Sequence, residues 1–170
     1  MPDHRRLLLI SVLVLTALFF VEYFFLRDEY FFLPDFLQEL LPDSVINKPM
    51  PIGGLFLFLG LWGLYYVVFK RILKQDDSIS MWYLIVFGGL IALFSEVIYQ
   101  FYRQFTFDDV ANWERMLIFF KGVLALTVFS SIIAFSTAYD LKYKNRWISS
   151  VIVFGLLFIY KYAVEYLGLI

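Results

Sequence analysis

The sequence contains no cysteine and only one histidine, His4. Without cysteine, the chain has no disulfide, thiolate metal site, iron–sulfur cluster or cysteine nucleophile. One histidine near the N-terminus excludes a multi-histidine metal or haem site and a histidine-based catalytic dyad within one chain. We therefore expect no metal, no cofactor and no catalytic residues of a familiar class.

Charge is also scarce. Charged residues make up 17% of the chain and the formal net charge is −1, so the sequence has no basic surface of the kind that binds nucleic acid. Hydrophobic residues, in contrast, make up 62% and aromatic residues 22%, whereas a soluble domain is roughly half apolar. This composition predicts an all-α integral membrane protein whose constant partner is the lipid bilayer.

Five apolar stretches are long enough to cross a membrane, which takes about 20 helical residues. The predicted transmembrane helices cover residues 7–26, 52–69, 81–102, 116–138 and 147–167. The first stretch follows a basic tail, as in a signal peptide, but it is long and no small-x-small cleavage site follows it. We interpret it as a retained span. No repeat or linker divides the chain, so residues 1–170 are predicted to form a single transmembrane domain.

Two features are expected between these spans. Residues 35–41 place Phe36, Leu37, Leu40 and Leu41 on one side of a helical turn, which predicts a short helix lying in the plane of the membrane interface. Before the third span, three side chains are candidates for its N-terminal cap: Asp77, Ser78 and Ser80.

The charges of the connecting segments predict how the chain is threaded. The N-terminal tail and the segments 70–80 and 140–146 are basic, whereas the segments 27–50 and 104–115 contain many carboxylates. Because basic loops stay in the cytoplasm, the N-terminus is predicted to be cytoplasmic and the C-terminus to lie outside. The protein is then expected in the cytoplasmic (inner) or plasma membrane.

The third span carries one small and polar stripe. At about 100° per residue, its members fall within roughly a quarter of the circumference. A stripe of this kind is expected to face protein or water rather than lipid. Its residues are Gly88, Ala92, Ser95, Glu96, Tyr99 and Arg103.

Ionisable residues of several spans fall at one depth. At about 1.5 Å per residue, Glu22 and Glu96 lie roughly 23 Å above the inner surface, and Lys121 and Lys161 roughly 21 Å. Glu165 follows about one turn higher. The candidate intramembrane polar cluster is therefore Glu22, Glu96, Tyr99, Lys121, Lys161 and Glu165.

Three interpretations of this cluster stay open. Its members can form structural ion pairs, including Lys161 with Glu165 on one helix. They can line a functional pocket or conduit, or they can anchor the helix ends at lipid headgroups by snorkelling. Because an unpaired charge in the membrane is costly, we expect Glu96 to pair with Lys121 or Lys161.

Small residues on the spans predict where helices approach closely. Glycine, alanine, serine and threonine at such positions are typical of helix-packing seams in membranes rather than of ligand sites. The candidate packing residues are Gly60, Gly88, Ala92, Thr127, Ser131 and Ala134.

Three classes of function are compatible with these features. The first is a non-catalytic subunit or accessory protein that acts through intramembrane helix packing with another membrane protein. The second is a small oligomeric transporter or channel that uses Glu96, Lys161, Lys121 and Glu22 for coordination or gating. The third is an intramembrane enzyme with Glu22 and Glu96 in acid–base roles, for which no further motif exists. Either a membrane-protein partner or a homo-oligomer is expected.

Overall fold

The computed structural model describes residues 2–26, 30–31, 50–107 and 113–166. Within these residues the chain is helical except for turns and one short strand pair. The elements are α1 (Pro2–Val21), the π-helix η1 (Glu22–Leu26), β1 (Tyr30–Phe31), β2 (Met50–Pro51), α4 (Ile52–Gln75), α5 (Met81–Phe107), α6 (Trp113–Tyr143) and α7 (Arg146–Tyr166). The two strands pair antiparallel, with Tyr30 opposite Pro51. The interfacial helix predicted for residues 35–41 lies outside the described residues.

Within the described residues, four of the helices are long and apolar enough to cross a membrane. These segments are His4–Leu26, Ile52–Gln75, Met81–Tyr102 and Phe119–Tyr143. The apolar part of α7, Trp147–Tyr160, is shorter. The prediction of a helical protein with several membrane-spanning segments is therefore supported for four helices, and the fifth span stays a prediction.

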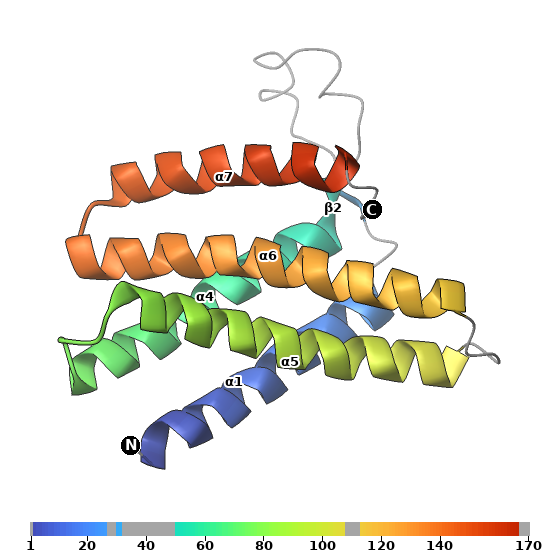
Figure 1. The fold of residues 1–170 in the computed structure, drawn as a ribbon, viewed down its shortest axis with the longest axis horizontal. Coiled ribbons are helices and arrows are strands. Elements are labelled where there is room, and N and C mark those ends of the chain that lie inside the picture. Colours follow the sequence, from blue (N-terminus) through green and yellow to red (C-terminus); the bar gives the residue numbers. More distant parts are fainter. Residues whose placement is uncertain (1, 27–29, 32–49, 108–112, 167–170) are drawn as a thin grey trace.

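Helix α6 lies at the centre of the bundle. It contacts α4, α5 and α7, while α1 contacts α4 and α5 (Figure 1). Helices α5, α6 and α7 run side by side, and α1 and α4 cross them obliquely. Helix α7 packs chiefly against α6 and forms one side of the bundle.

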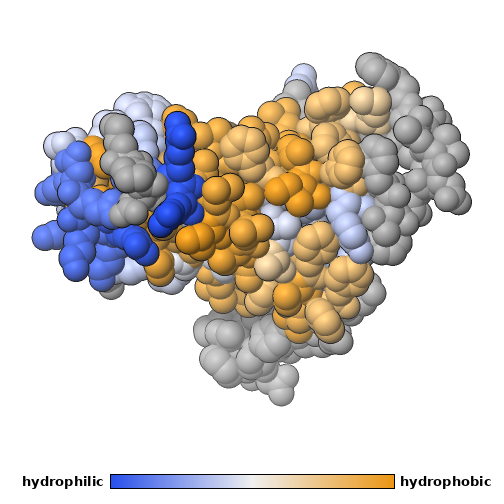
Figure 2. Space-filling view, turned by 90° about the horizontal axis from the view of Figure 1, so that it is seen from below, coloured by the Kyte–Doolittle hydropathy of each residue, from blue (hydrophilic) through white to orange (hydrophobic). Residues whose placement is uncertain are grey.

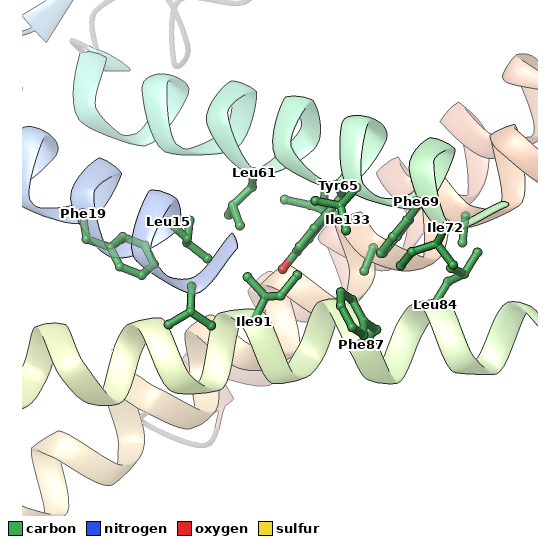
Figure 3. Packing of buried hydrophobic residues seen from close by; sticks show 14 of the residues in the cluster. Leu15, Phe19, Leu61, Tyr65, Phe69, Ile72, Leu84, Phe87, Ile91 and Ile133 are labelled. Atoms are coloured by element: carbon green, nitrogen blue, oxygen red, sulfur yellow. The ribbon is translucent and has the colours of Figure 1, made fainter. Parts of the chain in front are cut away.

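The hydrophobic core lies where α1, α4, α5 and α6 meet (Figure 3). Helix α4 contributes a row of buried side chains at helical spacing, among them Leu61, Tyr65, Phe69 and Ile72. These side chains form one row, because residues three and four apart share one helix face. The row packs against α5 and α6 (Figure 3). The remaining labelled core residues are Leu15, Phe19, Leu84, Phe87, Ile91 and Ile133.

Two tight turns set the directions of the last helices. Ser80 caps α5, because its hydroxyl accepts a hydrogen bond from the Tyr83 backbone N–H at 3.2 Å. Of the three candidate caps, the structure uses this one. Between α6 and α7, Lys144 has a left-handed backbone with φ 53°, and the Asn145 side chain accepts a hydrogen bond from the Ile148 N–H at 3.2 Å. This turn reverses the chain and places α7 antiparallel to α6.

Hydrophilic residues gather at one end of the molecule (Figure 2). The N-terminus, the α4–α5 turn and the α6–α7 turn all lie at that end. Exposed basic residues there include Arg5, Arg6, Lys70 and Arg71. The three segments with a basic bias therefore share one end of the bundle, as the threading prediction requires, and we refer to it as the basic end. Which side of a membrane it faces stays a prediction.

Candidate functional site

Glu96 is buried between helices, with 4% of its surface exposed. Its carboxylate accepts a hydrogen bond from the side-chain amide of Gln100 at 2.7 Å. Gln100 lies one turn further along α5, at the i,i+4 spacing that brings side chains together on a helix. The sequence places the Gln100 amide at the depth of the polar cluster, but we expected a lysine and not Gln100 as the partner of Glu96, although the i,i+4 spacing was a usable signal.

The Gln100 amide also reaches α6. Its nitrogen lies 3.2 Å from the position that a Cβ would take at Gly122. Gly122 follows Lys121, which is half-buried on α6. The structure thus places Glu96, Gln100 and the Lys121–Gly122 segment in the same contact between α5 and α6.

The remaining ionisable members of the cluster lie elsewhere on the chain. Lys161 and Glu165 belong to α7, and their side chains lie outside the described part of the structure. The pairing of Glu96 with Lys121 or Lys161 therefore stays a prediction.

Glu22 is the first residue of the π-helix η1 and packs against α4. Its carboxylate oxygen lies 2.6 Å from where a Cβ would stand at Gly53. Any side chain at Gly53 would have to displace this carboxylate, so glycine at the start of α4 allows Glu22 to approach. Short π-helical segments occur frequently at functional sites.

Aromatic rings connect the Glu22 region to α5. The ring of Tyr99, which is 8% exposed, lies 6.0 Å from the ring of Tyr23. It also contacts Phe19 at 5.5 Å and Phe20 at 5.7 Å, measured between ring centroids. The candidate polar cluster is therefore accompanied by tightly packed aromatic side chains where α1 and η1 meet α5.

A second buried polar group joins three helices. Tyr65 of α4 is fully buried and stacks on Phe69, with 5.4 Å between ring centroids. Its hydroxyl donates to the Gly88 carbonyl of α5 at 3.0 Å and shares a hydrogen bond with the Ser130 hydroxyl of α6. Sequence reasoning did not single out Tyr65, because its role depends on how three helices are rotated against one another.

The candidate packing residues on α5 and α6 lie at a close crossing. A Cβ at Gly88 would stand 2.6 Å from the Cβ of Ala134, and one at Gly89 would stand 3.3 Å from the Ser131 hydroxyl. Ala92 is fully buried. The Ser131 hydroxyl donates to the Thr127 carbonyl at 2.8 Å, within α6.

Gly60 lies at a different helix contact from Gly88 and Gly89, which face α6. A Cβ at Gly60 would stand 2.9 Å from a methyl of Leu18 on α1. Gly60 therefore lies at the crossing of α1 and α4, away from the α5–α6 pair.

A half-open cleft of about 600 Å³ lies between α4, α6 and α7. Helices α4 and α7 form its walls and α6 its floor. The Ser136 hydroxyl of α6 bonds to the Ser149 hydroxyl of α7 at 2.7 Å, and Ser149 also donates to the Ser136 carbonyl at 2.9 Å. The lining residues are Phe58, Leu59, Trp62, Gly63, Tyr66, Val67, Ile133, Ser136, Thr137, Asp140, Ser149, Ser150, Val153 and Phe154.

Sequence reasoning did not identify this cleft. The available signal was weak: Ser149 and Ser150 stand near the start of an otherwise apolar span, and Ser136 and Thr137 near the end of the preceding one. Small polar residues in such positions are equally typical of helix packing.

Among the described residues, no group of three His, Asp or Glu side chains is placed to hold a metal ion. Comparisons with protein-family models, curated proteins and solved structures return no match for this chain. The assignment of a function therefore depends on the geometry alone.

Proposed function

We propose that this chain is a non-catalytic, multi-pass membrane protein that acts as a subunit or accessory protein and binds a transmembrane helix of its partner through α7. The observation that supports this proposal is the position of α7. This helix packs chiefly against α6, at the side of the bundle, and most of its large apolar side chains that the structure describes are exposed.

The open surface of α7 is apolar and rich in aromatic residues. At about 100° per residue, Trp147, Val151, Phe158 and Tyr162 fall on one face, opposite the side that contacts α6. Their exposed fractions are 85%, 70%, 63% and 57%. Large aromatic side chains supply much of the contact energy where proteins associate.

This face also contains a surface depression at Gly155. A Cβ at Gly155 would meet nothing within 4 Å. Gly155 stands one turn from both Val151 and Ile159, so its missing side chain leaves a depression between bulky neighbours. Small residues let the backbone of a second transmembrane helix approach closely, which is a main source of helix association in lipid.

The natural absence of cysteine allows a direct test. Single cysteines at Val151 and at Phe158 would be labelled with a photoreactive maleimide in native membranes and irradiated. We expect a discrete cross-linked product from both positions, because they share one face of α7. The matched control is Leu13→Cys, since Leu13 is 67% exposed on the apolar surface of α1.

The mass of the product identifies the partner. A product of twice the chain mass supports self-association, and a product of another single mass supports a distinct subunit. Equal, diffuse or absent cross-linking at α7 and at Leu13 would refute the proposal, because α7 would then face only lipid.

A small oligomeric transporter is the second candidate function, and the burial of Glu96 favours it. An ionisable residue buried in a membrane helix is costly and frequently functional. In this case Glu96, with Lys121, Lys161 and Glu22, would coordinate or gate the transported species. Ion flux through proteoliposomes that is lost in Glu96→Gln, together with a closed homo-oligomer, would favour transport over the accessory function.

A further inference from the structure

We propose that the cleft between α4, α6 and α7 binds one phospholipid of the ethanolamine class, with its headgroup at the basic end and an acyl chain along the cleft. This inference does not depend on the partner of α7. It is supported by the gradient of polarity in the cleft, by its place along the helices, by its size and by the charges at its mouth.

The lining changes from polar to apolar along α6 and along α7. On α6, Asp140, Thr137 and Ser136 precede Ile133 when the helix is followed away from the basic end. On α7, Ser149 and Ser150 precede Val153 and Phe154. The α4 wall is largely apolar along its whole length, with Val67 and Tyr66 nearest the basic end. A ligand that matches this lining has one polar end and one long apolar end.

The gradient is aligned with the expected bilayer. The polar lining residues Asp140 and Ser149 stand next to the α6–α7 turn, which lies at the basic end of the bundle (Figure 1). From Asp140 to Ile133 the cleft rises about 10 Å along α6, at 1.5 Å per residue. This distance fits one leaflet, about half of the 30 Å hydrocarbon core.

The charges at the polar end suit a zwitterionic headgroup. The Asp140 carboxylate lines the cleft and can accept hydrogen bonds from an ammonium group. The Lys70 ammonium lies 5.6 Å from the ring centre of Tyr66, another lining residue, so a cation stands near the same mouth. Ethanolamine phospholipids carry a primary ammonium for Asp140 and a phosphate for Lys70.

The size of the cleft favours a lipid chain over a protein helix. Its volume of about 600 Å³ is in the range of small-molecule sites, roughly 300–1,000 Å³. A helix about 10 Å wide that spans 30 Å of membrane would fill roughly 2,400 Å³. The cleft therefore accommodates an acyl chain but only a small part of a transmembrane helix.

The test uses purified full-length protein in detergent, titrated with dioleoyl phosphatidylethanolamine or dioleoyl phosphatidylglycerol and analysed by native mass spectrometry. We expect one tightly bound ethanolamine lipid for each chain. Gly63→Phe should abolish this binding, because a Cβ at Gly63 meets nothing within 4 Å and the ring would fill the cleft. Leu13→Phe is the control, since Leu13 is 67% exposed on α1 and does not line the cleft.

The headgroup assignment has its own variants. Asp140→Asn should reduce the preference for the ethanolamine lipid over the glycerol lipid about tenfold, the scale of one charge-assisted hydrogen bond. Asp77→Asn, at an exposed carboxylate in the α4–α5 turn, should leave the preference unchanged. Lys70→Gln should weaken the binding of both lipids, because both carry a phosphate.

Three results would overturn the proposal. Wild-type-like binding by Gly63→Phe, or equal loss in Gly63→Phe and Leu13→Phe, would place the lipid outside the cleft. A lipid-free dimer that Gly63→Phe converts to a monomer would show that a second copy occupies the cleft. Thermal unfolding of each variant excludes misfolding as the cause of a loss.

Discussion

Replacement of Gly88 by alanine tests whether the close approach of α5 and α6 holds the bundle together. The new Cβ would stand 2.6 Å from the Cβ of Ala134, 3.2 Å from a ring carbon of Phe69 and 3.6 Å from one of Tyr65. A Cβ is fixed to the backbone and cannot rotate away. The two helices must therefore separate, or the Phe69 ring of α4 must move.

The magnitude follows from two opposing effects. Alanine is favoured over glycine inside a helix by about 1 kcal/mol. Overpacking a filled core costs about 1–3 kcal/mol, and a weaker Tyr65 hydrogen bond to the Gly88 carbonyl would add about 1 kcal/mol. We expect Gly88→Ala to lower the free energy of unfolding by about 1–3 kcal/mol in total.

Reversible unfolding in mixed detergent micelles measures this change. Gly63→Ala is the control, because its Cβ meets nothing within 4 Å and only the gain in helix propensity should appear. Ala134→Gly in the Gly88→Ala background removes the closest contact and should recover part of the loss. Gly88→Ala as stable as Gly63→Ala, or a double variant whose effects are simply additive, would refute the packing argument.

Three further predictions follow from the structure. Tyr65→Phe should destabilise the protein by about 1–3 kcal/mol, because the buried Ser130 hydroxyl loses its interhelical partner, and Ser130→Ala should recover part of this loss in the same unfolding assay. The Ser78 hydroxyl, followed by the Ser78 backbone N–H, lowers the pKa of Asp76 below its ordinary 3.8. The stabilisation from Asp76 is thus present above pH 3.8 and disappears as the pH falls through the lowered pKa. Ser78→Ala should raise the pKa of Asp76 in an NMR titration. An unchanged pKa would contradict the assignment of the shift to Ser78. A reporter at Gln75 should appear in the cytoplasm and one at the C-terminal end outside, whereas finding both on one side would eliminate a five-span topology.

The helices themselves were accessible from the sequence, because long apolar runs determine where a chain can form membrane-spanning helices. The stripe on the third span is a sharper example. Helical periodicity alone places six residues on one face. The structure buries five of them, Gly88, Ala92, Ser95, Glu96 and Tyr99, and the side chain of the sixth, Arg103, lies outside the described part. Periodicity works here because it requires only the geometry of one helix.

Contacts between helices were not accessible in the same way. The three-helix junction at Tyr65 depends on the rotation and depth of α4, α5 and α6 relative to one another. The hydropathy of α4 gives no sign of this, since a tyrosine in an apolar span equally suits a lipid interface. The cleft is harder still to predict, because it depends on the distance between α4 and α7. These two helices are separated in the sequence by α5 and α6, so no local pattern sets that distance.

The junction at Tyr65 also has a consequence for biosynthesis. Gly88, which supplies the first acceptor, follows Tyr65 by 23 residues, and Ser130 follows it by 65. Ser130 therefore follows Gly88 by 42 residues, which the ribosome adds in roughly 2–8 s at about 5–20 residues per second. During that interval the α4–α5 hairpin alone can occupy the Tyr65 hydroxyl, so the nascent chain holds a paired polar group in the membrane until α6 arrives and locks the three helices together.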